Sequence, residues 1–151
     1  MQVFYSPKTN KHSPKSFISR GNLIQSPERA ERATILKSAA EKAGHRIVEI
    51  LPEKLQNTLD IHDEGYLRFL QSAWDQWSVL DERSEEIIPN VHPGRNMSAS
   101  PNAIVSAAGH YQADTACPIG AGTWEGAKAS ADTVIAAATN LFKRYRDNEP
   151  E

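Results

Sequence analysis

The sequence predicts an α/β domain in which a few parallel strands are flanked by about four helices. A short β-prone run, Gln2-Val3-Phe4-Tyr5, opens the chain, and a second spans Arg46 to Leu51. Between them, apolar residues recur at helical spacing: Ala30, Ala33, Leu36, Ala40 and Ala43. The order strand, helix, strand is typical of a parallel βαβ unit.

Local signals predict where the elements of this unit begin and end. Residues 7 to 25 are polar and rich in turn formers, which predicts a long loop. Ser26-Pro27 predicts the start of the first helix, because serine is a good N-cap and proline fits the first helical position. Gly44 is the expected end of that helix, and Pro52 is expected to close the second strand.

The next helix is expected to begin at Asp60 or Asp63, either of which could cap it. A broad apolar face follows at helical spacing: Tyr66, Leu67, Leu70, Ala73, Trp74 and Trp77. Residues 81 to 100 are charged and then rich in Pro, Gly, Ser and Asn, which predicts a second long loop.

Two more helices are expected in the last third of the chain. Ser100-Pro101 repeats the capping signal and predicts a helix to about Tyr111, and Gly120 and Gly122 then mark a turn. In the final helix, apolar residues alternate spacings of three and four: Trp124, Ala127, Ala131, Val134, Ala138, Leu141 and Tyr145. This pattern predicts a seam that packs against other elements.

Composition limits the classes of function. The 151 residues predict one domain, 1–151, and a net charge of −2 without a basic face argues against a nucleic-acid partner. No apolar run approaches membrane-spanning length and no signal sequence is evident, so no membrane partner and a cytoplasmic location are expected. The single cysteine, Cys117, agrees with a reducing compartment.

Three segments carry a resemblance to a known family. They are Pro27-Glu28-Arg29-Ala30, Ile61-His62-Asp63-Glu64-Gly65-Tyr66-Leu67 and Cys117-Pro118-Ile119-Gly120-Ala121-Gly122-Thr123-Trp124-Glu125-Gly126-Ala127. In order and spacing they resemble the first part of the zinc-dependent deacetylases, most closely the acetylpolyamine amidohydrolase branch and more distantly the histone deacetylases. The resemblance runs from Met1 to about Ala138. It implies a partial arginase/deacetylase-like fold, to which this chain contributes the first strands and helices.

The resemblance implies zinc as the cofactor of the family but gives this chain no metal ligands. Family members bind zinc through a Pro-Gly-His-His segment, an Asp-x-His segment and a later Asp, none of which follows the last helix here. Asp60-Ile61-His62 has the letters of Asp-x-His, but it lies at a predicted helix start, where a capping Asp and a structural His are expected. The five histidines lack metal-ligand spacing, so no metal site is predicted.

The resemblance also gives candidate binding residues. Arg29 matches an arginine that lines an internal channel in related deacetylases; alternatively, it is an exposed helical arginine paired with Glu28 or Glu31. The family places an acidic residue on its active-site rim for cationic substrates. That position falls on Ala116 here, and Asp114 is close but out of register. Asp114, Thr115 and Ala116 are therefore the candidates for contact with a small cationic ligand.

A loop and a cysteine complete the candidates. In acetylpolyamine amidohydrolases, a loop that matches His92, Pro93, Arg95 and Met97 helps form the dimer. A dimer contact is the hypothesis for these residues, with a solvent-exposed loop as the alternative. For Cys117 there are two alternatives, a reactive thiolate and a small buried side chain, and the buried side chain is the expectation.

Two main hypotheses for function follow. In the first, the chain is a truncated, non-catalytic relative that acts as an interaction or regulatory module, as a homodimer or with a partner protein. It is favoured because the last helix ends in a polar tail. In the second, the chain is the N-terminal part of a zinc-dependent acetylpolyamine or acetyl-lysine amidohydrolase completed by another chain or by further sequence. A third hypothesis is a small-molecule binding module.

Overall fold

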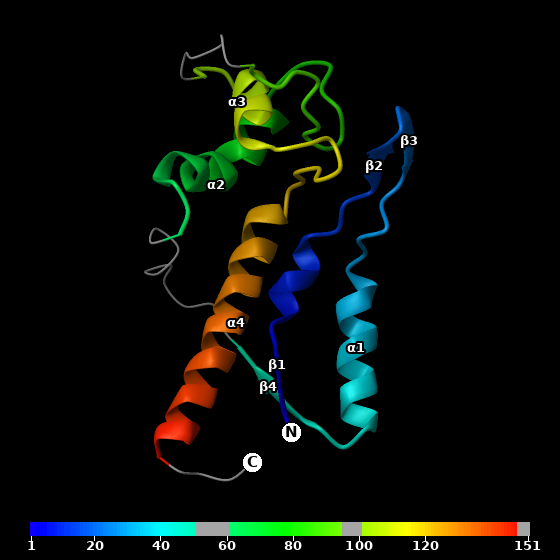
Figure 1. Cartoon of the computed structure of the whole chain (residues 1–151). Helices are drawn as coiled ribbons and strands as arrows, with labels where there is room; N and C mark the ends of the chain where they lie inside the picture. The colour runs from blue at the N-terminus through cyan, green and yellow to red at the C-terminus, as the bar shows by residue number, and fades with distance from the viewer. Residues whose placement is uncertain (51–60, 95–100, 148–151) are drawn as a thin grey trace.

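The computed structural model describes residues 1–50, 61–94 and 101–147. Its elements (Figure 1) are the strands β1 (Gln2–Tyr5), β2 (Ser16–Ser19), β3 (Asn22–Gln25) and β4 (Arg46–Glu49), the 3₁₀ helix η1 (Pro7–Lys11), and the helices α1 (Glu31–Lys42), α2 (Glu64–Ser78), α3 (Ile104–Tyr111) and α4 (Thr123–Arg146). The predicted α/β class, with few parallel strands and four helices, is confirmed.

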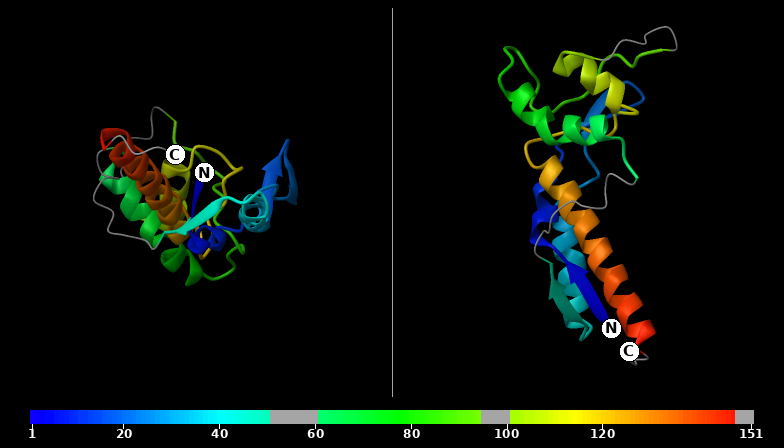
Figure 2. Two further views of the ribbon diagram at one scale, coloured as in Figure 1. Left: turned by 90° about the horizontal axis from the view of Figure 1, so that it is seen from below. Right: turned by 90° about the vertical axis from the view of Figure 1, so that its left-hand side faces the viewer.

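The parallel sheet consists of β1 and β4, joined by α1 as a βαβ unit. Gln2 lies opposite Arg46 and Tyr5 opposite Glu49. The Nζ of Lys37 in α1 lies 5.9 Å from the centroid of the Tyr5 ring, so α1 covers the face of the sheet to which Tyr5 points. The views in Figures 1 and 2 show the sheet between α1 and α4, and α4 contacts β1.

The prediction of a loop over residues 7 to 25 is wrong. The structure has η1 there, followed by an antiparallel hairpin in which Ser16 of β2 lies opposite Gln25 of β3. Arg20 and Gly21 form its turn with φ values of 51° and 79°, since a two-residue hairpin turn favours the left-handed conformation. Strands of four residues are too short to give a clear alternation of apolar and polar residues, so the sequence pattern did not indicate them.

The Ser26-Pro27 signal marks a turn ahead of a helix instead of its first residue. α1 begins at Glu31, because Ser26 Oγ accepts a hydrogen bond from the Glu28 backbone N–H at 3.2 Å in a local turn. α3 begins at Ile104, three residues after Pro101, and the predicted cap Ser100 lies outside the described residues.

Other predicted boundaries are confirmed. Gly44 follows α1 with a φ of 77°, the left-handed conformation that ends many helices. Asp63 is the N-cap of α2, and its Oδ1 accepts hydrogen bonds from the backbone N–H groups of Gly65 and Tyr66 at 2.7 and 3.2 Å. The alternative cap Asp60, like Leu51 and Pro52, lies outside the described residues.

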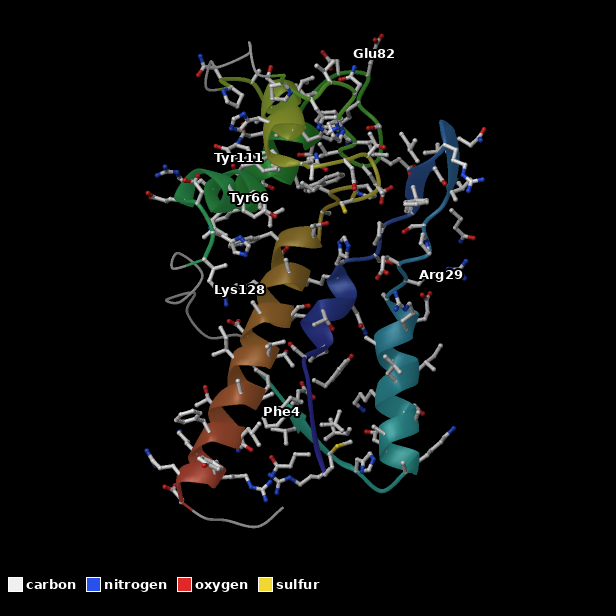
Figure 3. All side chains as sticks on the ribbon, in the orientation of Figure 1. Phe4, Arg29, Tyr66, Glu82, Tyr111 and Lys128 are labelled. Atoms are coloured by element: carbon white, nitrogen blue, oxygen red, sulfur yellow. The ribbon has the colours of Figure 1, made fainter. Side chains whose placement is uncertain are left out.

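The apolar core of the described residues lies between α2, α3 and the loops near them. Its buried members are Phe69, Ala73, Ile87, Ile104, Ala108 and Ile119. Tyr66 and Tyr111 pack against this cluster with ring centroids 6.2 Å apart (Figure 3). The predicted face of α2 omitted Phe69, its most buried large residue. Ile87 and Ile119 pair by backbone hydrogen bonds, which link the two loops.

The helix α4 forms as predicted, but its predicted packing seam is wrong. Val134, Leu141 and Tyr145 of that seam are 68%, 68% and 83% exposed. The helix packs instead through Gly126 and Ala129, the two residues that it buries. A side chain at Gly126 would place its Cβ 2.7 Å from Cβ of His12, so only glycine allows this close approach.

Candidate functional site

A polar cleft lies where η1 and the beginnings of α1 and α4 meet. Its volume is about 350 Å³, and Arg29, labelled in Figure 3, is one of its lining residues. Its polar lining comes from three separate segments: Thr9, Asn10, His12, Glu28, Arg29, Arg32, Thr123 and Ser130. A concave site with a few convergent polar groups is the usual form of a small-molecule site.

A hydrogen-bonded pair in the lining of this cleft joins His12, the residue after η1, to the first residue of α4. Nδ1 of His12 lies 3.0 Å from Oγ1 of Thr123, and the same hydroxyl accepts a hydrogen bond from the Gly120 backbone N–H at 2.9 Å. The hydroxyl proton can therefore be donated to Nδ1, which leaves the imidazole proton on Nε2. Burial lowers the pKa of His12 below its ordinary 6.5, and the Glu28 and Glu86 carboxylates only partly oppose this shift. His12 is thus a neutral hydrogen-bonding group at pH 7.

The lowered pKa of His12 predicts a stability that declines in acid. Below about pH 6.5 the unfolded chain takes up a proton at His12 that the folded chain resists, so the free energy of unfolding falls until pH reaches the lower folded pKa. We expect His12→Asn to flatten this part of the Tm-against-pH curve, measured by circular dichroism from about pH 7.5 to 5. His62→Asn, at an exposed histidine, is the control and should keep the wild-type slope. Equal slopes for all three proteins would contradict the assignment.

Arg29 lies in this cleft, but neither predicted partner pairs with it. It is exposed, precedes α1, and its Nη2 donates to Oε1 of Gln25 at 2.9 Å. Glu28 forms an ion pair with Arg32 at 2.6 Å instead. The expectation of a helical Arg29 paired with an acidic neighbour is therefore wrong, because the helix begins two residues later.

The rim candidates lie in the loop between α3 and α4, apart from the lining of the cleft. Oδ1 of Asp114 accepts a hydrogen bond from the Ala116 backbone N–H at 2.7 Å, so this carboxylate shapes its own turn. Asp114 is exposed, whereas Thr115 and Ala116 are half-buried. The lining residues include Arg29 and none of these three, so the structure does not bring the predicted binding residues into one site.

Cys117 is exposed, which makes the expectation of a buried side chain wrong. Its neighbours Pro118 and Ile119 are buried instead. Partial burial and the neighbouring Asp114 carboxylate raise the pKa of the Cys117 thiol, which disfavours the thiolate.

The predicted dimer loop is described only in part. Nδ1 of His92 lies 3.2 Å from the Gly109 carbonyl oxygen, so this residue is anchored on α3. Pro93 is half-buried, and Arg95 and Met97 lie outside the described residues.

Sequence reasoning missed Asn10, His12 and Thr123 as residues of one site. His12 was one of five scattered histidines, and Thr123 belonged to a helix start. No local signal joins positions 111 residues apart in sequence, and only the packing of α4 on η1 brings them together.

Over residues 1–50, 61–94 and 101–147, no group of three or more His, Cys, Asp or Glu side chains is placed to hold a metal ion. In the same ranges, no helix is long and apolar enough to cross a membrane.

Comparison with known proteins identifies the relatives of the chain. No protein-family model matches it. It is 32% identical over 151 residues to an acetylpolyamine amidohydrolase of Burkholderia pseudomallei (strain 1710b), covering 99% of this chain and 42% of the relative. It is 31% identical over 140 residues to the acetylpolyamine amidohydrolase of Mycoplana ramosa, covering 91% of this chain and 41% of that protein.

A solved structure agrees with these matches. The crystal structure of acetylpolyamine aminohydrolase from Burkholderia pseudomallei superposes with a TM-score of 0.84 at 29% identity, over 93% of this chain and 41% of that one. This chain thus spans about two fifths of the length of the relatives that it matches. Its homologues are acetylpolyamine amidohydrolases of the histone deacetylase family, and the chain corresponds to an N-terminal portion of their arginase/deacetylase fold.

Proposed function

We propose that this chain functions as an interaction module of the deacetylase fold and is not catalytic by itself. One observation carries the proposal: the parallel sheet has no buried apolar side chain. Val3, Phe4, Ile47 and Val48 are all only partly buried. Parallel sheets occur almost only with both faces covered by other elements. The apolar side chains of this sheet are only partly covered by the rest of the chain, as expected for a sheet that packs against another polypeptide.

The exposed area of the chain supports the same proposal. The accessible surface is 10812 Å², whereas a compact monomer of 16.7 kDa exposes about 7,600 Å². The excess of about 3,200 Å² lies on one chain, whereas obligate interfaces bury about 2,000–5,000 Å² summed over both partners, so the excess is larger than the share of a single partner. Association with another polypeptide is the ordinary way to remove such an area from water.

A contiguous apolar surface lies on α4. We call it the α4 strip: Val134, Ile135, Leu141, Phe142 and Tyr145, which are 41% to 83% exposed. Their spacing places them on one side of the helix, opposite the side that packs on η1 through Gly126 and Ala129. Exposed apolar surfaces of this kind mark sites of protein association.

A homodimer is the proposed assembly, because a strip on a straight helix can pack against its own copy about a two-fold axis. We expect the wild-type chain to sediment as a dimer at micromolar concentration. Phe142→Glu should give monomers, since it buries a charge in the interface, and should keep a folded circular-dichroism spectrum, since Phe142 is 75% exposed. Lys143→Glu, at the exposed neighbouring position, is the matched control and should remain dimeric. A monomeric wild-type chain would argue against the homodimer.

A second candidate function is favoured by the close match to known enzymes. A TM-score of 0.84 with the Burkholderia pseudomallei structure means that this chain has the arrangement found in the corresponding part of that protein. We propose that a polypeptide bearing the zinc ligands of the family could complete it, giving amide hydrolysis of an acetylated, cationic substrate. The purified complex would then contain stoichiometric zinc and deacetylate an acetylpolyamine. A cytoplasmic location belongs to both proposals.

A further inference from the structure

The hairpin of β2 and β3 is tied to the rest of the chain at β2 and open at β3. At the start of β2, the backbone N–H groups of Lys15 and Ser16 donate to the buried carboxylate of Glu86 at 2.7 and 2.8 Å. β3 is exposed along its whole length, and within the described part of the chain no further strand pairs with it. Figure 1 and Figure 2 (left) show the hairpin projecting from one side of the molecule.

The backbone groups at the open edge of β3 can be assigned. The Ser26 N–H donates to the Lys15 carbonyl oxygen at 2.9 Å, which makes these two residues a hydrogen-bonded pair at the base of the hairpin. Hydrogen-bonded and non-hydrogen-bonded pairs alternate along antiparallel strands. Leu23 and Gln25 therefore belong to non-hydrogen-bonded pairs, and their N–H and C=O groups point to the free edge. An extended peptide can add to a sheet through such groups.

The side chains of β3 favour the addition of a strand. Edge strands of natural proteins carry charged residues, proline or bulges that discourage pairing, whereas β3 reads Asn-Leu-Ile-Gln. Leu23 and Ile24 lie on opposite faces of the strand and are 67% and 46% exposed. Across the hairpin they lie opposite Ile18 and Phe17, so each face has an apolar centre that a third strand would extend. Two-stranded hairpins are marginally stable, and a third strand stabilises them.

Both ends of β3 are basic. Arg20 is exposed in the turn at one end. At the other end, the exposed Arg29 donates from Nη2 to Oε1 of Gln25 at 2.9 Å. Glu28 is the first acidic residue of the chain, and it is already paired with Arg32 at 2.6 Å. A strand added to β3 would thus have an apolar stretch beside its middle and a cation near each of its ends.

We propose that the free edge of β3 binds an extended peptide segment of another protein, with an apolar centre and acidic residues on both sides of it. The inference goes beyond the proposed homodimer, because β3 is separate from the α4 strip. A second copy of the chain fits this edge less well. Two β3 edges related by a two-fold axis pair antiparallel, which brings Arg20 of each copy beside the basic end of the other strand.

The test measures the fluorescence anisotropy of a labelled peptide, Glu-Glu-Val-Ile-Val-Glu-Glu, on addition of the full chain. Leu23→Pro removes one outward N–H at an edge position, where proline is tolerated, and Leu23→Val is the matched control that keeps it. We expect Leu23→Val to bind within about threefold of wild type and Leu23→Pro to bind at least about tenfold more weakly. The same peptide with lysine in place of glutamate should bind at least about tenfold more weakly to wild type.

A second pair of variants tests the charge at the turn. Arg20→Asn removes the cation and creates Asn-Gly, the favoured sequence of this turn type, so the hairpin is retained. The glutamate peptide should bind this variant about two- to fivefold more weakly. Lys8→Asn, at an exposed lysine of η1, is the control and should bind as wild type does. Protection of the Ile24 amide from hydrogen exchange verifies the hairpin in every variant.

The outcomes separate this inference from the proposed function. Equal affinity of wild type and Leu23→Pro, or of the two peptides, would overturn the inference. If wild type binds neither peptide and Leu23→Pro weakens self-association, the edge serves a second copy and the inference fails. Phe142→Glu should bind the glutamate peptide as wild type does. Dimers that Phe142→Glu disrupts, without peptide binding by wild type, would leave the proposed function standing alone.

Discussion

Gly109→Ala is expected to destabilise the chain by about 3 kcal/mol. A Cβ at this position of α3 would lie 1.8 Å from the Val91 carbonyl oxygen and 3.0 Å from its carbonyl carbon. Backbone cannot move aside as a flexible side chain can, so α3 would have to separate from the segment that His92 anchors on it. Buried Ile104 and Ala108 would lose their packing with it. Urea denaturation followed by tryptophan fluorescence measures the loss.

Gly120→Ala is the control for this prediction. No heavy atom lies within 4 Å of the Cβ built at Gly120, and this residue does not have a positive φ. The control should therefore change the free energy of unfolding by less than about 0.5 kcal/mol. Equal midpoints for the two variants would show that α3 does not pack on Val91 as described.

Glu86→Gln is expected to cost about 2–3 kcal/mol. Glu86 is 5% exposed, and its two carboxylate oxygens accept hydrogen bonds from the backbone N–H groups of Lys15 and Ser16 at 2.7 and 2.8 Å. The glutamine amide has one acceptor oxygen and an NH₂ group that cannot accept, so one backbone N–H would be left buried without a partner. These bonds hold the beginning of β2 against the core, and a two-stranded hairpin alone is only marginally stable. Thermal unfolding measures the loss, and hydrogen exchange locates it in the hairpin.

Glu85→Gln is the matched control, one residue away on the surface. Its carboxylate forms an ion pair with Lys15 Nζ at 3.1 Å, and both side chains are more than 70% exposed. Solvent screens such a pair, so the expected change is below about 0.5 kcal/mol. If Glu85→Gln destabilised as much as Glu86→Gln, charge and not the buried hydrogen bonds would hold the hairpin.

The candidate site shows how far local reasoning extends. The resemblance drew attention to Arg29, and the structure places it in the cleft. His12 and Thr123, which line the same cleft, come from segments whose own patterns indicated only a loop and a helix start. Asp114, chosen for its charge and position, uses its carboxylate within its own turn.

The sequence by itself determined the features that depend on near neighbours or on whole motifs. These are the α/β class, the βαβ unit, the cap at Asp63, the end of α1 at Gly44, and the resemblance to deacetylases. Each follows from spacing, capping chemistry or motif order, all of which are local in the chain.

Only the tertiary structure decided which faces are covered. It set the hairpin against Glu86, turned α4 so that Gly126 meets His12, and left the predicted seam of α4 exposed. Within the part of the chain that the structure describes, no further strand pairs with either edge of the parallel sheet. The physical reason is that burial depends on contacts between residues distant in sequence. A helical pattern fixes the period of an apolar stripe, but the shape of the neighbouring element selects the side that packs.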